Sequence, residues 1–354
     1  LKHFDGKFKK NFQKRFPLRI NAPLRCIGEE SLYNPAIVEY RERIKERYVP
    51  DTNSRIVLII PCSAKKPYSF SKSHKLFGQA IRDGLKNTRM LSELIVTSPL
   101  GVVPRELESI YPARFYDIPV VGKWSEEEIN ISAELLANIL QNYPKNTVII
   151  NHTNGKGYKE IIEYVKDYTD FEIIDTALTS SPTSSVSLSM LTNTLRELDE
   201  QISQNGSSPP IIRMLKAIAD FQFGKGVGEI LFKSKVKIKG RYPRNREIYI
   251  DNHHVATLTT ADGFLSLSPK YAQNIIEIAK VNVEFTAERV KGSSIYAPGC
   301  EKADENILPR DEIFIIHDGK VIGTAMALVS GVDMNKMRSG MIATIKKKRK
   351  DEEN

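Results

Sequence analysis

One stretch of the sequence joins an apolar run to a series of reactive side chains. Residues 56–60 are Ile-Val-Leu-Ile-Ile, without polar alternation, which is the pattern of a strand covered on both faces. A thiol, hydroxyls, ammonium groups, a phenol and an imidazole follow, from Cys62, Ser63, Lys65, Lys66, Tyr68, Ser71, Ser73 and His74. Because ligands of open α/β sheets bind beyond the carboxyl ends of strands, we predict a reactive-site loop over residues 61–74. The alternative is a solvated polar turn.

The same pattern predicts alternating strands and helices from about residue 55 to residue 176. Strands are expected at 56–60, 93–97, 147–150 and 171–174, and helices at 75–85, 125–142 and 158–168. Ser125 and Glu128 are spaced as a capping box, and Asn34 before Pro35 indicates the start of an earlier helix. This alternation favours an α/β fold with a three-layer, parallel-sheet catalytic domain.

Two breaks divide the chain after this region. Residues 179–189 are rich in serine and threonine, residues 204–210 contain Gly and two Pro, and the pattern after residue 281 is mostly that of strands. We expect a basic N-terminal extension (1–50), an α/β catalytic domain (51–190), a linker helix with a small α+β domain (191–278), and a C-terminal β-barrel (279–350).

The composition narrows the class of protein. The 354 residues are 41% hydrophobic and 27% charged, as in ordinary globular proteins, and neither an apolar run of bilayer length nor a signal peptide is evident, so we expect no membrane association. Three distant cysteines, Cys26, Cys62 and Cys300, argue against a disulfide framework and a CxxC metal site. We therefore expect a reducing, cytoplasmic compartment and no cofactor.

The net charge of +9 is unevenly distributed. Residues 233–246 contain no acid, and the first four of their cations occupy every second position, so a strand would present these four on one face, about 6.6 Å apart. Such a stripe is typical of nucleic-acid phosphate contacts; the alternative is a solvated basic face. The seven cations are Lys233, Lys235, Lys237, Lys239, Arg241, Arg244 and Arg246.

Three segments resemble known families. The string at 290–299, with 311–315, 321–325 and 340–343, resembles a PUA domain, a small β-barrel that binds RNA in RNA-modifying enzymes. Residues 219–232 resemble the domain that precedes PUA in archaeal tRNA-guanine transglycosylases and their paralogues. Residues 61–74 resemble the signature of the archaeosine synthase family, one of these paralogues. The resemblance does not include the transglycosylase-like barrel with which longer members begin.

The resemblance implies a transferase that acts on tRNA carrying 7-cyano-7-deazaguanine in its D-loop. Addition of an amine would convert the nitrile to an amidine, with free lysine or another amine donor as co-substrate. A radical-SAM partner enzyme would then release archaeosine, and a separate transglycosylase-like subunit is a further implied partner. The alternatives are a non-catalytic tRNA-binding subunit that presents tRNA to a partner enzyme, and base exchange or glycosidic cleavage by the α/β domain.

Cys62 is the candidate nucleophile. Its thiolate would attack the nitrile carbon to give a thioimidate, which the amine then displaces. Lys66 would favour the thiolate, and His74 would act as proton donor or base. Each has an alternative: Cys62 as a small buried hydrophobe, Lys65 and Lys66 as phosphate contacts, His74 as a helix cap.

The remaining candidates would bind substrate. Ser63, Ser71 and Ser73 would orient it, and Tyr68 would stack on the base or hydrogen-bond to it. Two more loops follow predicted strands, so Gly101, Glu106 (or Glu108) and His152 are also predicted at the site.

Overall fold

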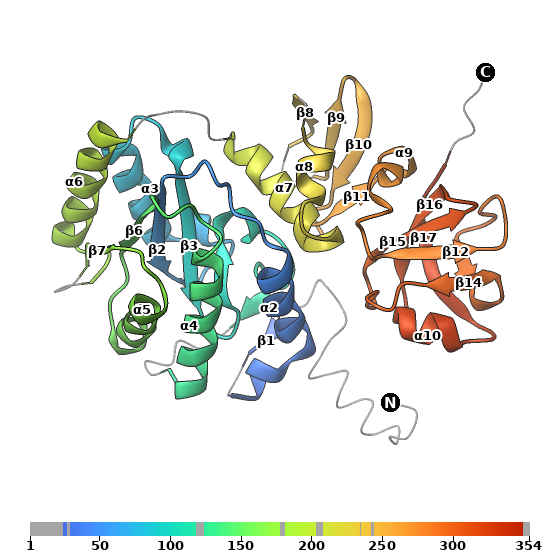
Figure 1. Ribbon diagram of the computed structural model, residues 1–354, viewed down its shortest axis with the longest axis horizontal. Helices are drawn as coiled ribbons and strands as arrows, with labels where there is room; N and C mark the ends of the chain where they lie inside the picture. Colours follow the sequence, from blue (N-terminus) through green and yellow to red (C-terminus); the bar gives the residue numbers. More distant parts are fainter. Residues whose placement is uncertain are drawn as a thin grey trace. The chain divides into compact units, whose positions relative to one another are not determined.

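The computed structural model describes residues 24–26, 29–117, 124–177, 181–202, 208–233, 235–241 and 244–349. Part of the expected basic N-terminal extension therefore lies outside the described residues. The chain divides into two compact units, Leu1–Met214 and Leu215–Asn354. Figure 1 labels the helices and strands of each unit.

The first unit contains a five-stranded sheet with strand order β4-β3-β2-β6-β7. Strands β2, β3, β6 and β7 are parallel, whereas β4 runs antiparallel to β3. The sheet is therefore mixed, because the chain turns back after β3 into a strand where sequence reasoning placed a loop. The strands are β2 (Ile56–Pro61), β3 (Leu91–Thr97), β4 (Gly101–Pro104), β6 (Val148–Asn151) and β7 (Ile173–Asp175).

Strand β2 is the centre of this sheet. Its first five residues are buried, as the unbroken apolar run predicts. It hydrogen-bonds to β3 on one side and to β6 on the other, so its carboxyl end has parallel strands on both sides. A small separate sheet pairs β1 (Leu24–Arg25) with β5 (Tyr116–Asp117).

The helices of this unit form two groups by their contacts. Helix α4 contacts α2 and α5, and also strands β3 and β4, whereas α3 contacts α6. The helices are α2 (Pro35–Arg47), α3 (Lys72–Gly84), α4 (Glu126–Leu140), α5 (Lys156–Tyr168) and α6 (Ser185–Gln201). Helix α7 (Pro210–Phe223) follows, and its first residues belong to this unit.

The helix starts follow local capping chemistry. Asn34 accepts a hydrogen bond from the Ala36 N–H with Pro35 at the first helical position, and Ser125 with Glu128 forms the predicted capping box. Helix α3 begins three residues before the predicted Lys75, because the Ser71 side chain accepts the His74 backbone N–H and caps it. His74 therefore lies inside the first turn of α3 rather than before it.

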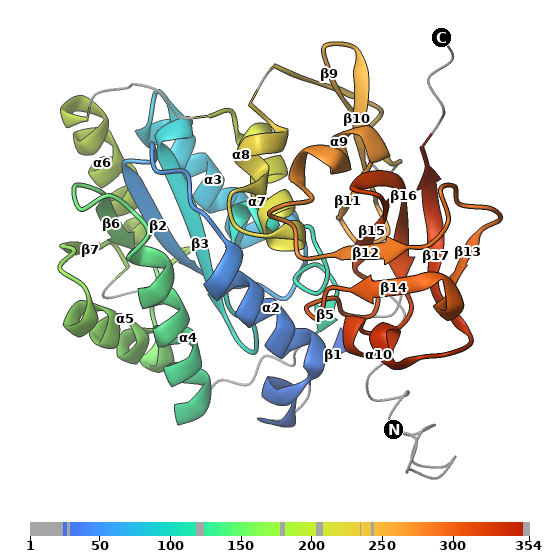
Figure 2. The ribbon, with the colours of Figure 1, turned by 45° about the vertical axis from the view of Figure 1, so that its right-hand side comes forward.

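The second unit contains two sheets. An antiparallel sheet of order β11-β10-β9-β8 precedes a six-stranded sheet of order β13-β17-β16-β15-β12-β14 (Figure 2). The first comprises β8 (Val236–Lys239), β9 (Arg246–Ile250), β10 (His253–Leu258) and β11 (Leu265–Leu267), and the second β12 (Asn282–Phe285), β13 (Ser294–Tyr296), β14 (Cys300–Ala303), β15 (Glu312–His317), β16 (Lys320–Ala327) and β17 (Met341–Lys348). The short helices α8 (Val227–Leu231), α9 (Pro269–Ala272) and α10 (Gly331–Lys336) complete it.

Candidate functional site

Cys62 lies directly after the carboxyl end of β2 and is half-buried. The Tyr158 hydroxyl, from α5, donates to its Sγ at 3.8 Å. Tyr158 packs against Trp124, with ring centroids 5.1 Å apart. The sulfur is therefore neither sealed in the core nor fully exposed, and a phenol from another element faces it.

Lys66 interacts electrostatically with Cys62. Its Nζ is 3.9 Å from the centroid of the Tyr116 ring. Burial lowers the pKa of Lys66 below its usual value, opposed by Cys62, Asp117 and Cys26. An ammonium that interacts with Cys62 and is partly removed from water is suited to hold a thiolate or to donate a proton.

Tyr68 is a structural part of this site. Its side chain is fully buried, and its hydroxyl bonds to that of Tyr116, which lies 2.6 Å from the Thr97 Oγ1. Its ring stacks on His74, with centroids 5.4 Å apart. A buried ring with an occupied hydroxyl leaves no face for an RNA base, so Tyr68 supports the loop instead.

His74 is buried and neutral. Burial lowers its pKa to about 3, with the Arg105 charge as a second cause. Its Nδ1 lies 2.8 Å from the Arg105 Nη2. The Pro61 carbonyl opposes this lowering of the pKa, and Nε2 makes no hydrogen bond within the described residues. An imidazole that stays neutral at pH 7 does not serve as an imidazolium proton donor, so the predicted acid role does not fit this environment.

Arg105 and Glu108 were not singled out from the sequence as a pair. Arg105 donates to Glu93 Oε2 through Nε at 3.0 Å and to Glu108 Oε2 through Nη1 at 2.8 Å. Burial alone would lower the pKa of Arg105, but these two carboxylates raise it above its usual value. Glu108 Oε2 also accepts the Ser69 backbone N–H at 3.0 Å. The network therefore contacts the reactive loop at Ser69 and at His74.

The small hydroxyl residues of the loop bond locally. Ser63 Oγ donates to the Lys65 carbonyl at 3.1 Å, and Ser71 Oγ is 3.2 Å from Ser73 Oγ. Ser71 is buried as the α3 cap, whereas Ser63 and Ser73 are half-buried and Lys65 is exposed. Three of these four, Ser63, Lys65 and Ser73, therefore remain accessible to a substrate.

Glu106 and Gly101 are not placed to bind substrate beside Cys62. Glu106 is 3.8 Å from Arg213 Nε, and Arg213 bonds to Ser54 and to the Leu91 carbonyl, at the amino ends of β2 and β3. Gly101 has a φ of 78°, and a methyl there would lie 3.0 Å from the Leu135 side chain. The lack of a side chain at this residue therefore permits the β3–β4 turn and the close packing of α4.

His152 follows β6 as predicted, but its ring is fully engaged. Nδ1 lies 2.8 Å from Thr176 Oγ1, Nε2 lies 2.8 Å from the Pro182 carbonyl, and no part of the residue is exposed. Burial lowers its pKa to about 4. This histidine ties β6 to the segment after β7 and has no nitrogen left for a substrate.

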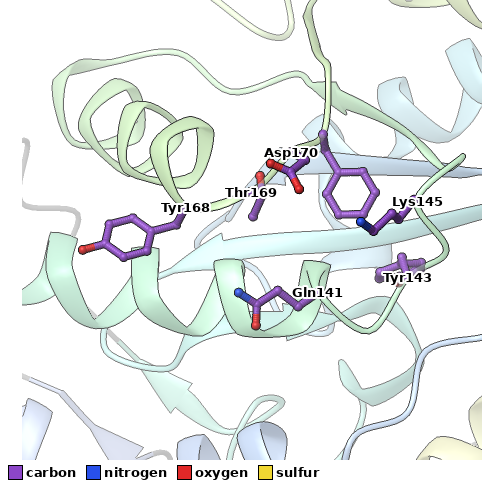
Figure 3. A pocket seen from close by; sticks show the side chains of 7 residues that line it. Gln141, Tyr143, Lys145, Tyr168, Thr169 and Asp170 are labelled. Carbon is purple, nitrogen blue, oxygen red and sulfur yellow. The ribbon is translucent and has the colours of Figure 1, made fainter.

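A pocket lies near the amino ends of β6 and β7 (Figure 3). Its side chains come from the end of α4 and the loop after it, and from the end of α5 and the residues after it. Its lining comprises Gln141, Tyr143, Lys145, Tyr168, Thr169, Asp170 and Phe171. No residue of the Cys62 loop lines it, so the pocket is separate from the candidate site.

Neither a metal site nor a membrane-spanning helix is found in the described part of the chain. No group of three or more His, Cys, Asp or Glu side chains is arranged there to hold a metal ion. Among the described helices, none combines the length and apolar character that crossing a bilayer requires.

The lysine stripe takes the predicted alternation. Along β8 the side chains of Lys237 and Lys239 are exposed, and Val236 and Ile238 are half-buried. Lys239 Nζ lies 4.3 Å from the centroid of the Tyr249 ring on β9. Of the other cations, Arg246 is half-buried and the rest are exposed: Lys233, Lys235, Arg241 and Arg244.

Comparison with protein-family models matches three consecutive regions. Residues 37–195 match a domain of unknown function (DUF5591), residues 213–281 match the patch-forming domain C2 of tRNA-guanine transglycosylase, and residues 275–348 match the PUA domain. The resemblance of the C-terminal strands to a PUA domain is thereby confirmed.

Curated relatives match nearly the whole chain. The archaeosine synthase subunit alpha of Thermococcus kodakarensis is 36% identical over 326 residues, which cover 91% of this chain and 55% of the relative. The archaeosine synthase of Haloferax volcanii is 32% identical over 340 residues, 93% of this chain and 54% of the relative. This chain thus spans about half the length of these relatives.

A solved structure shares the fold. The crystal structure of AF0587, a protein of unknown function, is 29% identical, with a TM-score of 0.64, and the match covers 88% of this chain and all of the other. With three matched domains in the same order and relatives of 30–36% identity, this chain is homologous to the archaeosine synthases over most of its own length.

Proposed function

We propose that this chain is the part of an archaeosine synthase that adds an amine to the nitrile of 7-cyano-7-deazaguanine in the tRNA D-loop. The observation that carries the proposal is the position of Cys62, half-buried after the carboxyl end of the central strand, with the Tyr158 hydroxyl at its sulfur and an electrostatic interaction with Lys66. The similarity to archaeosine synthases supplies the substrate class. The α/β region around this site would be a three-layer catalytic domain, supported by its two helix groups.

The proposed reaction needs two steps. The Cys62 thiolate forms a C–S bond to the nitrile carbon, and the nitrile nitrogen takes up a proton, giving a covalent thioimidate. The amine nitrogen then attacks the same carbon, the thiolate leaves, and the amine gives up one proton. The sum is nitrile plus amine to an N-substituted amidine, with no oxidant, water or nucleotide consumed. Free lysine is the proposed amine.

Lys66 is the proposed proton donor to the nitrile nitrogen, in place of His74. It is an ammonium that interacts with Cys62 and its pKa is lowered by burial, which brings its acidity closer to neutral pH. The Tyr158 phenol holds the sulfur by a hydrogen bond, although burial raises its own pKa well above the usual value. This disfavours its ionisation, so we assign Tyr158 to orienting the thiol.

The second unit would hold the RNA. Lys237 and Lys239 are exposed on β8, and Lys239 also lies over the Tyr249 ring. Such an arrangement is typical of a surface that contacts phosphates and bases. The PUA match supports the same role. The partner enzyme that releases archaeosine, and a separate transglycosylase-like subunit, remain proposals from the family resemblance.

The function is tested by incubating the purified chain with nitrile-bearing tRNA and lysine, without ATP. Mass spectrometry of the digested tRNA should detect the amidine adduct with the parent chain and with Cys300→Ala, a control at another half-buried thiol. Cys62→Ala should form none while its affinity for tRNA is retained. Full adduct yield from Cys62→Ala would remove Cys62 as the nucleophile.

The same experiment decides the alternative of a tRNA-binding subunit. That alternative predicts tight binding of the tRNA by the parent chain with no adduct formed from any amine. The half-buried, partnered thiol favours the enzyme, because a surface that only presents RNA does not require a reactive group at the end of the central strand.

A further inference from the structure

Arg105 is the hub of a buried network beside the reactive loop. Its guanidinium donates to Glu93, to Glu108 and toward His74 Nδ1, at 3.0, 2.8 and 2.8 Å for Nε, Nη1 and Nη2 respectively. Its side chain is one-fifth exposed. These contacts join strand β3, the turn after β4 and the first turn of α3.

The contact with His74 fixes a tautomer. A guanidinium has donors only, so the nitrogen that faces it must be an acceptor. His74 Nδ1 is therefore unprotonated, and the single proton of the neutral ring is on Nε2. The Nε2 atom is buried and makes no hydrogen bond within the part of the chain that the structure describes.

Through Glu108, the network also contacts the backbone of the loop near its end. Glu108 Oε2 accepts both the Arg105 Nη1 and the backbone N–H of Ser69. The network thus holds the loop at two points near its end, the Ser69 backbone and the His74 ring. The ring of His74 is further confined between Tyr68 and Phe77, each with its centroid 5.4 Å away.

We propose that Arg105 is a positioning residue for Cys62: it fixes the Nε2–H tautomer of His74 and, with Glu108, holds the loop that carries the thiol at Ser69 and at His74. The catalytic consequence rests on the proposed function, whereas the tautomer and the loop restraint do not. His74 then acts by holding the end of the loop and exchanges no proton with the substrate.

The tautomer is tested without substrate. Two-bond 15N–1H NMR correlations of the parent chain at pH 7, with the His74 signals identified by their loss in His74→Gln, should show a protonated Nε2 and an unprotonated Nδ1. A protonated Nδ1, or an imidazolium, would overturn the proposal.

The loop restraint is tested with Arg105→Lys, which keeps the charge but lacks the three-way fork. Alkylation of Cys62 by iodoacetamide is monitored by peptide mass spectrometry, with Cys300 in the same chain as the internal control. Alkylation of Cys62 should become on the order of threefold faster as the loop opens locally, with Cys300 unchanged. An unchanged Cys62 rate together with an unchanged His74 tautomer would refute the role.

The catalytic consequence is tested with the same variant. The kcat of adduct formation should fall about 10- to 100-fold, because a small misplacement of the nucleophile has effects of this size. The KM for tRNA should be unchanged. Arg213→Lys, at another largely buried arginine, is the matched control and should retain kcat. A proportional rise in KM with kcat retained would contradict positioning. Should the parent form no adduct, the proposed function fails, and the NMR and alkylation results still decide the role of Arg105.

Discussion

The buried imidazole of His152 predicts a specific dependence of stability on pH. The folded protein lowers the pKa of His152 to about 4, whereas an unfolded histidine has a pKa of about 6.5. The lowered pKa means that this histidine's contribution to stability is fully present above pH 6.5. It is lost as the pH falls from 6.5 toward 4, because the unfolded chain then binds a proton that the folded chain does not.

The magnitude follows from these two values. Between pH 7 and pH 5 the protonated fraction of the unfolded residue rises from about one-quarter to nearly one, whereas that of the folded residue stays at about one-tenth or less. The linkage relation converts this to about 2 kcal/mol of lost free energy of unfolding. The His152→Gln variant does not titrate in this range, so it should lose about 2 kcal/mol less than the parent over the same interval.

The assay uses urea unfolding followed by tryptophan fluorescence. Trp124 is the only tryptophan of the chain and packs against Gly157 and Tyr158 in the first unit, so it reports the unit that contains His152. The exposed His253 provides the control: His253→Gln should follow the parent at both pH values. An equal difference between parent and His152→Gln at pH 7 and pH 5 would refute the linkage.

Three further predictions concern other parts of the chain. Ser71→Ala removes the cap of α3 and should lower the free energy of unfolding by about 1 kcal/mol in the same fluorescence assay; an unchanged midpoint and slope would show that the cap is dispensable. Lys237→Ala with Lys239→Ala should weaken tRNA binding and flatten its salt dependence by about one slope unit for each phosphate that is no longer neutralised. Lys270→Ala, at an exposed lysine outside the stripe, is the control. An unchanged slope in the double variant would count against the role of the stripe. Gly228→Ala places a methyl 2.5 Å from a backbone oxygen and should destabilise the second unit by about 1–3 kcal/mol in calorimetry; a wild-type melting temperature would contradict this.

Local signals in the sequence predicted much of the fold. The unbroken apolar run at 56–60 is the central strand, and Asn34 and Ser125 cap the helices that they were expected to cap. These features are determined within a few residues of sequence, so no knowledge of the tertiary structure was needed. The alternation along β8 was predicted for the same reason.

The departures arise where tertiary contacts decide. Residues 99–106 looked like a loop because prolines flank a short apolar stretch, yet Val102 and Val103 pair with β3 as the antiparallel strand β4. His152 was placed correctly along the chain, but its partners Thr176 and Pro182 lie 24 and 30 residues away in sequence. Periodicity carries no information about such partners.

The site itself shows the same limit. Glu106 and Glu108 were equivalent candidates, yet the turn between them sends Glu106 toward Arg213 and Glu108 toward Ser69 of the reactive loop. The hydrogen bonds of the Arg105 network join residues up to 39 positions apart in the sequence. A charged Arg-x-x-Glu pair beside a buried strand is the one sequence signal that suggests it.

The most direct test of the account is to trap the covalent thioimidate. Nitrile-bearing tRNA incubated with the chain in the absence of amine should give a protein–RNA species that survives denaturation, and peptide mapping should place the base on Cys62. Added lysine should release the RNA as the amidine. Trapping of an equal amount by Cys62→Ser, or of the RNA on any other residue, would contradict a thiol nucleophile at the end of β2.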